Sequence, residues 1–313
     1  SRSSAASDVY KRQILFLFSI MITTISKCWS FDFTEVEKGM YVHFGTQEDS
    51  NSENIGDIAN IGFIIGTKSI AVIDAGASVK IGKAMLKKIK KTSKLPISHI
   101  IITHSHPDHF LGTEALIADN PIIIGHENLN RSLINNFDFY KALQFNLTKD
   151  ESLKTTNLIL ANKFVKKNQT LKINLGGRNL IIRAWSSGHT DNDLSIYDEN
   201  SKIFWSENIF VDRIPSIRAS ILGWRKNLSE IQKLDINKIV PGHGPVISKI
   251  EAISPMIDYL DELISEVRFF HENNKSLDYV LKNINQENKQ GWLLYDEYHM
   301  SNTTKAFTEL EWE

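Results

Sequence analysis

The sequence predicts an α/β protein in which strands and helices pack in layers. Three observations support this prediction: short apolar runs alternate with polar turns, amphipathic stretches of helical spacing lie between those runs, and no internal repeat or low-complexity tract interrupts the pattern. Strands mixed with helices along one chain are typical of layered architectures that share a hydrophobic core.

Seven apolar runs of strand length are bounded by polar or turn-forming residues, which predicts strands. The turn "GTKS" joins the first two runs and predicts a hairpin. The runs are residues 60–66, 69–76, 97–103, 121–125, 180–185, 194–197 and 202–210.

Three stretches are predicted to be helices. Their apolar residues recur at helical spacing, which indicates faces that pack on the core. They are residues 78–91, residues 127–170 around Phe137, Tyr140 and Leu143, and residues 253–270.

The composition is that of a globular chain that buries a core of ordinary size. The 313 residues are 42% hydrophobic and 23% charged, with a formal net charge of −1. Lys and Arg residues are scattered over amphipathic stretches, so we expect no nucleic-acid partner.

The N-terminal segment is predicted to stand outside the fold. Residues 1–12 resemble a translated sequencing adaptor and are set aside. Residues 13–30 resemble a signal peptide, because basic residues precede an apolar run from Ile14 to Ile25 and a small-x-small site ends at Ser30. The run is shorter than the ~20 residues that span a bilayer. We therefore expect a periplasmic mature chain without stable membrane insertion; the alternative is a retained N-terminal anchor.

Cys28 is the single cysteine of the chain, and it lies within the predicted signal peptide. The mature chain then contains no cysteine. This excludes disulfides, thiolate metal ligands and a cysteine nucleophile in the mature protein.

The stretch "HSHPDH" follows the apolar run "ISHIIIT" directly. Strand residues two apart face the same side, so His104 and His106 aim two imidazoles at one point. Pro107 ends the strand, and Asp108 and His109 at the start of the next helix reach a second point nearby. The positive end of that helix favours the anionic ligands gathered there. The segment therefore predicts two neighbouring metal sites.

Two further histidines stand on glycine-bounded loops at strand ends, His189 in "GHTDND" and His243 in "VPGHGP". Such loops carry functional groups on a rigid scaffold. Clustered imidazoles and carboxylates repel one another without a cation, which predicts a bound metal. Five other histidines are interpreted as structural: His43, His99, His126, His271 and His299.

These residues make the chain resemble a metallo-β-lactamase-fold hydrolase from about Tyr41 to Val246, because the family pattern HxHxDH is met in full. The resemblance implies a four-layer αββα sandwich over residues 31–250, with a C-terminal helical extension over residues 251–313 packed on the same domain. It also implies two zinc ions per chain. Iron or manganese is the alternative, since imidazole and carboxylate also suit those metals. The implied ligands are His104, His106 and His189 for the first ion, and Asp108, His109 and His243 for the second.

Glu207 marks a departure from the family pattern. Many dizinc members have an Asp that bridges both metals at this position, whereas "SENIF" supplies a Glu. The longer Glu207 side chain is a candidate metal ligand. The alternative is a site that favours one bound metal ion over two. The best-known β-lactam hydrolases have Cys at this position, so the Glu disfavours membership of that subfamily.

The stretches "NIGDIANIGFIIG", "GHTDNDLSIYDE", "RIPSI", "LGW" and "ELEWE" are similar to the periplasmic zinc metallohydrolases associated with quinoprotein relay systems and sulfur oxidation. This narrower resemblance covers nearly the whole mature chain. It implies an exported protein linked to periplasmic oxidative metabolism, with a periplasmic dehydrogenase system as a partner.

The expected function is that of an exported zinc-dependent hydrolase. Metal lowers the pKa of bound water to around 7, so a hydroxide oriented by Asp108 would attack the carbonyl of an ester, thioester, lactone or β-lactam-like amide. The alternatives are a metal-containing accessory protein of a quinoprotein dehydrogenase or sulfur-oxidation system with little turnover, and an iron oxidoreductase. Asp74, Asp191 and Asp193 are candidate partners of ligand histidines.

Overall fold

The computed structural model describes residues 31–313. The predicted signal peptide and the segment before it lie outside the described residues. Among the helices that are described, none is long and apolar enough to cross a bilayer.

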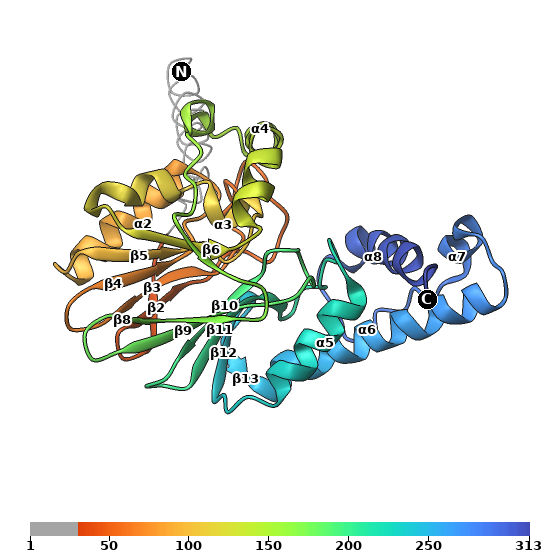
Figure 1. Cartoon of the computed structure of the whole chain (residues 1–313). Helices are drawn as coiled ribbons and strands as arrows, with labels where there is room; N and C mark the ends of the chain where they lie inside the picture. The colour runs from red at the N-terminus through yellow and green to blue at the C-terminus, as the bar shows by residue number, and fades with distance from the viewer. Residues whose placement is uncertain (1–30) are drawn as a thin grey trace, which may run out of the picture. The chain divides into compact units, whose positions relative to one another are not determined.

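Within residues 31–313 a seven-stranded sheet forms the first half of the fold (Figure 1). Its first four strands pair antiparallel, and the pairs from β4 to β7 are parallel. The strands are β1 (Thr34–Glu37), β2 (Met40–His43), β3 (Ile61–Ile65), β4 (Ile70–Ile73), β5 (Ile97–Ile101), β6 (Ile122–His126) and β7 (Lys163–Val165).

The second sheet of the described chain has six strands in the order β13-β12-β11-β10-β9-β8, and only its β11–β12 pair is parallel. Together the two sheets contain all seven predicted strand runs. The strands are β8 (Thr170–Asn174), β9 (Asn179–Ala184), β10 (Leu194–Asp198), β11 (Ile203–Phe210), β12 (Lys238–His243) and β13 (Ile247–Ser248).

The inner faces of the two sheets share one hydrophobic core. Strand β9 alternates between buried and half-buried residues, so Leu180 and Ile182 point to the same face. They pack in one cluster with Met40, Ile64 and Ile101 of the first sheet. Burial of each such side chain stabilises the fold by about 1.5–3 kcal/mol relative to its exposure, which holds the sheets face to face.

Helices cover the outer faces of both sheets and complete the four layers that the family resemblance implies (Figure 1). Ser78 caps the first helix of the outer layer, which buries Ile81, Met85 and Ile89. Two helices cover the second sheet, and two more follow at the C-terminus. The helices are α2 (Val79–Thr92), α3 (Pro107–Phe110), α4 (Leu129–Thr148), α5 (Ile221–Gln232), α6 (Lys249–Glu272), α7 (Leu277–Asn283) and α8 (Tyr295–Leu310), with 3₁₀ turns η1 (Thr113–Asp119) and η2 (Glu151–Thr155).

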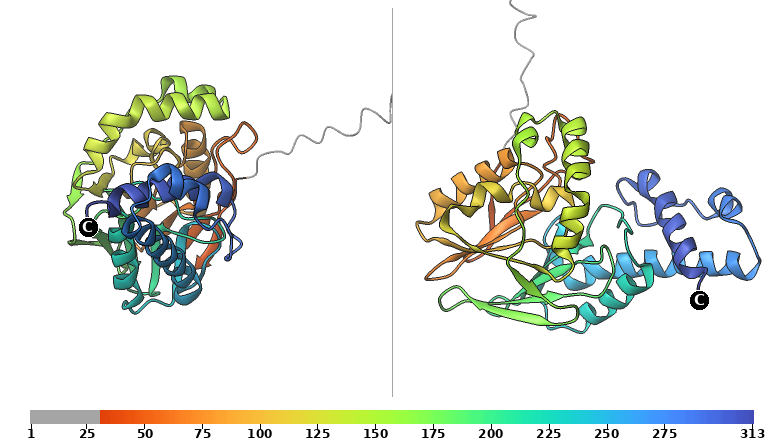
Figure 2. Two further views of the ribbon diagram at one scale, coloured as in Figure 1. Left: turned by 90° about the vertical axis from the view of Figure 1, so that its right-hand side faces the viewer. Right: turned by 45° about the horizontal axis from the view of Figure 1, so that its top comes forward.

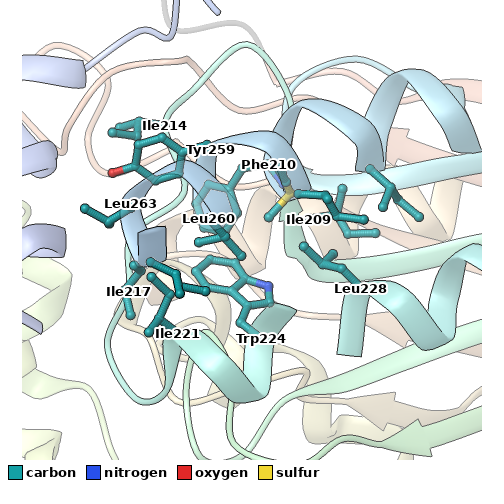
Figure 3. Packing of buried hydrophobic residues seen from close by; sticks show 14 of the residues in the cluster. Ile209, Phe210, Ile214, Ile217, Ile221, Trp224, Leu228, Tyr259, Leu260 and Leu263 are labelled. Carbon is teal, nitrogen blue, oxygen red and sulfur yellow. The ribbon is translucent and has the colours of Figure 1, made fainter. Parts of the chain in front are cut away.

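The C-terminal helices belong to a second hydrophobic cluster, on the outer side of the second sheet. Trp224 of α5 is fully buried in this cluster with Phe210 of β11 and Leu260 of α6 (Figure 3). Its indole Nε1 donates a hydrogen bond to the Asn208 carbonyl, at 3.0 Å. Helix α8 contacts both α5 and α6, so the C-terminal segment is packed on the sheet through α6 (Figure 2).

The helix predicted over residues 127–170 is too long. Helix α4 ends at Thr148, because Lys149 adopts a left-handed conformation with φ of 57° and donates its backbone N–H to the Phe145 carbonyl. Asp150 then caps the 3₁₀ turn η2, and the chain continues into β7. The strands β1, β2, β7, β8 and β13 were not predicted, because they are short or partly exposed and lack a long apolar run.

Candidate metal centre

The candidate ligands come together where several strands end. His104 and His106 follow β5, and Asp108 and His109 lie in α3. His189 stands on the loop between β9 and β10, and His243 is the last residue of β12. The structure thus brings all six histidine and aspartate ligands implied by the family pattern to one place.

The first group contains His104, His106 and His189, each of which offers one ring nitrogen within 4.8 Å of the others. His106 Nδ1 lies 2.9 Å from His104 Nε2 and 3.0 Å from His189 Nε2. Three imidazoles therefore converge on one point beside a surface cavity.

The hydrogen bond on the far side of a ring fixes which nitrogen faces this point. His189 Nδ1 lies 2.7 Å from the Ser216 carbonyl oxygen, which only accepts hydrogen bonds, so Nδ1 carries the proton. The lone pair of His189 then sits on Nε2 and faces His106. Metal-ligating histidines are held in this way, with the other N–H donated to a carbonyl or carboxylate.

The second group contains Asp108, His109 and His243. Asp108 Oδ2 lies 3.3 Å from His109 Nε2 and 3.9 Å from His243 Nε2. His243 Nδ1 lies 2.8 Å from the Ile58 carbonyl, so its Nε2 also bears the lone pair. The two groups adjoin, since the rings of His104 and His109 are 4.2 Å apart between centroids.

Asp74 and Glu207 form a third group with His109, on the other side of its ring. His109 Nδ1 lies 2.8 Å from Asp74 Oδ2, which also accepts from the hydroxyl of Thr103. The same nitrogen is 3.6 Å from Glu207 Oε2. Glu207 is therefore placed beside His109 Nδ1 instead of between the first two groups.

Glu207 is enclosed in the protein, and its two oxygens have different surroundings. Oε1 accepts a hydrogen bond from the Trp205 indole, while Oε2 has no hydrogen-bond partner among the described residues. A Cβ at Gly242 would stand 2.7 Å from this oxygen. A glycine on the neighbouring strand thus makes room for the longer carboxylate.

Burial and charge set the protonation of these groups. Desolvation lowers the pKa of His106 to about 4 and that of His243 to about 3. Burial alone would raise the pKa of Asp108, but the adjacent His109 holds it well below its usual range. Desolvation would lower the pKa of His109, yet Asp108 and Asp74 raise it well above its ordinary value.

The donor set fits a divalent metal. His106 and His243 are neutral near pH 7 and Asp108 is ionised, as metal ligands must be. In the first group, lone pairs of neutral imidazoles face one another at about hydrogen-bond distance. Such an arrangement is repulsive unless a cation or a proton lies between the nitrogens.

Two of the remaining aspartates have other roles. Asp193 accepts hydrogen bonds from the backbone and hydroxyl of Thr190, next to His189, and desolvation raises its pKa to about 7. Asp191 pairs with Arg131 at the surface. Within residues 31–313, Asp74 is therefore the one of the three predicted partners whose carboxylate is hydrogen-bonded to the ring of a candidate ligand.

The five histidines interpreted as structural lie outside all three groups. His43 bonds Asp57, His99 bonds Ser98, His126 bonds the Trp185 carbonyl, His271 bonds the Phe307 carbonyl, and His299 bonds the Asn285 carbonyl and the Tyr259 hydroxyl.

A cavity of about 550 Å³ opens over the first two groups. Its floor contains His106, Asp108, His189 and His243. Its rim contains Phe139, Tyr140, Leu143 and Leu147 of α4, Arg213 and Arg218 after β11, and Tyr298 of α8.

The rim residues were missed as site residues by the sequence analysis. Arg218 belongs to no motif, Arg213 was noted only as the first residue of "RIPSI", and Tyr298 lies 55 positions after His243, the nearest floor histidine. The aromatic residues of α4 were interpreted as core packing. A partial signal was the spacing of four between the apolar residues at 139, 143 and 147, which puts them on one face of the helix, and the structure leaves this face exposed.

The fold and the donor groups define a class of protein, and comparison with known proteins agrees. Residues 54–243, more than half of the chain, match the family model of the metallo-beta-lactamase superfamily. The chain belongs to this superfamily, whose members include metal-dependent hydrolases, as the sequence predicts.

Among curated proteins, the chain is 26% identical over 217 residues to the Beta-lactamase-like protein 2 homolog of Caenorhabditis elegans, an alignment of 68% of this chain and 66% of that protein. It is 33% identical over 58 residues to the Linear primary-alkylsulfatase of a Pseudomonas species, covering 18% of this chain and 11% of that one. The chain thus spans less than two thirds of the length of both relatives.

Among solved structures, the sec-alkylsulfatase Pisa1 of Pseudomonas sp. superposes with a TM-score of 0.70 at 15% identity, covering 89% of this chain and 50% of that one. A metallo-beta-lactamase from Pontibacter korlensis superposes with a TM-score of 0.60 at 16% identity, covering 74% of this chain and 99% of that one. These similarities confirm the four-layer fold.

Proposed function

We propose that this protein is a zinc-dependent hydrolase that cleaves an ester, thioester, lactone or β-lactam-like amide. The observation that carries the proposal is the convergence of His104, His106 and His189 beside Asp108, His109 and His243, at the floor of a cavity large enough for a small molecule.

His104, His106 and His189 would hold one divalent ion, and Asp108, His109 and His243 a second. Bound there, the metal supplies Lewis acidity that activates water and polarises a carbonyl. The protein supplies the orientation: Ser216 and Ile58 fix the rings of His189 and His243 through their carbonyls, and Asp74 fixes the ring of His109.

Asp108 is the proposed catalytic carboxylate. It lines the cavity and stays ionised, because His109 beside it holds its pKa low. An ionised carboxylate at this position accepts a hydrogen bond from a water molecule and orients the water toward a substrate in the cavity.

A hydrolysis screen tests the proposal. Protein with its metal is assayed against an ester, a thioester, a lactone, a β-lactam and, because two relatives are named alkylsulfatases, an alkyl sulfate. We expect turnover of at least one carbonyl substrate that is abolished by a chelator and restored by zinc. Turnover that survives complete chelation would contradict the proposal, as would the absence of turnover from a fully metal-loaded protein.

The second candidate is a periplasmic accessory protein of a quinoprotein dehydrogenase or sulfur-oxidation system, with little turnover of its own. The Glu in place of the usual Asp, which lies beside His109 Nδ1 instead of between the first two groups, favours it. Glu207→Asp, which restores the usual family residue, should raise hydrolysis if the Glu restrains turnover. Unchanged hydrolysis in both Glu207→Asp and Glu207→Ala would remove the support for this candidate.

We also propose export to the periplasm through cleavage after Ser30. A tagged full-length chain expressed in a bacterium should lose these residues and be recovered in the periplasmic fraction. An uncleaved chain in the membrane fraction would support the retained anchor instead.

A further inference from the structure

The cavity over the donor groups has an apolar wall that no described residue covers. Phe139, Leu143 and Leu147 of α4 line the cavity at intervals of four, so they share one face of the helix. Their exposed fractions are 63%, 37% and 42%. An exposed apolar patch at the edge of a concave site indicates a surface for an apolar part of a ligand.

Tyr140 joins this apolar wall to the donor groups. It follows Phe139 on α4, lines the same cavity and places its ring 6.4 Å from that of His106, between centroids. The wall therefore begins beside the first group and runs outward along the helix. A ligand whose reacting end lies over the donor groups can extend its remaining length along α4.

The cavity lining also contains two arginines with different surroundings. Arg213 is buried, and its guanidinium pairs with Asp49 at 3.0 Å and lies 3.3 Å from the hydroxyl of Tyr298. Its charge is compensated. Its role is to tie the loop that holds Asp49 to helix α8.

Arg218 is exposed and lines the cavity, and among the described residues no carboxylate pairs with its guanidinium. Its backbone N–H donates to the His189 carbonyl at 3.1 Å, which fixes its position next to the first group. Its side chain lies over the Tyr298 ring, with the guanidinium carbon 5.7 Å from the centroid. Asp49 and Asp108 are the acids of the cavity lining; Asp49 pairs with Arg213, and Asp108 lies 3.3 Å from His109 Nε2.

We propose that the ligand of this cavity is an amphipathic anion whose apolar chain lies on Phe139, Leu143 and Leu147 and whose negative group binds Arg218. The proposal rests on the proposed function, since it names the substrate class of the same site. The uncompensated guanidinium and the uncovered apolar wall of the same cavity select for both halves of such a molecule. A fixed planar guanidinium also suits a carboxylate or sulfonate through paired hydrogen bonds.

Calorimetric titration with octanesulfonate tests the proposed ligand class. Because a sulfonate is a weak metal ligand, its binding measures the contacts with the cavity rim and not with the metal. The protein is used with the metal that it holds after purification. We expect octanesulfonate to bind, methanesulfonate to bind at least about tenfold more weakly for lack of the chain, and octyltrimethylammonium not to bind.

Single-residue variants test separately the binding of the negative group and of the apolar chain of the proposed ligand. Arg218→Ala should weaken octanesulfonate binding about tenfold, and Arg218→Lys should restore part of it. Phe139→Asn should weaken binding several-fold. The matched controls are Arg268→Ala, an arginine that pairs with Glu313 away from the cavity, and Ile134→Asn, which is 59% exposed on the same helix but does not line the cavity. Equal binding in Arg218→Ala and wild type would overturn the proposal, as would equal losses in the controls.

A paired substrate separates this proposal from the proposed function. A para-nitrophenyl monoester of a long dicarboxylic acid carries the anion, and the ester of the matched neutral acid does not. Preference for the anionic ester that disappears in Arg218→Ala supports both proposals. Equal hydrolysis of the two esters would contradict the proposed anionic substrate class and would still support the proposed hydrolase function. If octanesulfonate binding depends on Arg218 but no ester is hydrolysed, the result supports the proposed anion site and contradicts the proposed hydrolase function.

Discussion

The floor and the rim of the cavity are built in different ways. Floor residues such as His189 and His243 are buried, and a backbone carbonyl holds each ring. Rim residues such as Arg218 and Phe139 are exposed and come from segments far apart in the sequence. Under the proposed function, the floor determines the chemistry and the rim determines which molecule reaches it. Floor variants should therefore affect metal and turnover, and rim variants should affect substrate affinity.

The largest effect is expected for Asp108→Ala, which removes a floor carboxylate. Turnover should fall by more than about 100-fold, the upper range for loss of a group that only supports a metal ligand. The measurement is kcat on the best carbonyl substrate. Asp191→Ala is the control, since Asp191 pairs with Arg131 outside the groups. Similar losses in both variants would break the distinction between floor and surroundings.

Asp74→Asn tests the support beneath the floor. Asp74 has a φ of 56°, a conformation that Asn tolerates well, so the variant keeps the backbone while it removes the charge beside His109 and replaces one of the two accepting oxygens with an amide NH₂. We expect a loss of about 10–100-fold in metal affinity or turnover. Metal titration of the stripped protein measures it, and wild-type affinity would show that His109 needs no carboxylate partner.

The pH dependence of stability tests the burial of the floor histidines. Desolvation lowers the pKa of His106 in the folded chain to about 4, against an ordinary value of 6.5. The unfolded chain therefore binds the proton first, and His106 costs stability as the pH falls from about 6.5 to about 4. Denaturant unfolding of metal-free protein should show a shallower decline over this range in His106→Gln. Parallel curves for variant and wild type would argue against a desolvated His106.

The smallest effect is expected for Tyr298→Phe at the rim. The variant loses the hydroxyl that bonds Asp49 at 2.6 Å, but it keeps the ring beside Arg218. KM should rise less than about tenfold, because the net worth of a hydrogen bond is about 1 kcal/mol. The value of kcat should stay the same. A fall in kcat would mean that the rim also positions the reacting groups.

The sequence predicted the floor better than the rim, for physical reasons. His104 and His106 face one way because strand residues alternate, and Asp108 and His109 follow at a fixed distance once Pro107 ends the strand. Such local geometry can be derived from spacing alone. The position of Glu207 beside Asp74 depends on the packing of β11 against the loop after β4, and no spacing in the sequence encodes that contact.

The same reasoning applies to the fold. The seven apolar runs predicted strands correctly, since each buries most of its side chains. The end of α4 was missed because a left-handed Lys149 ends it, where a glycine would have given a signal. Rim residues such as Arg218 and Tyr298 meet only through tertiary packing, which a single sequence does not reveal.

Elemental analysis of the purified protein measures whether the converging histidines and Asp108 hold metal. We expect close to two divalent metal ions per chain, with zinc as the metal, and a clear loss of metal in His106→Ala and Asp108→Ala. Metal binding to the folded state should also raise the thermal midpoint relative to the stripped protein. A purified chain without transition metal that takes up none from solution, or floor variants with full occupancy, would contradict the account.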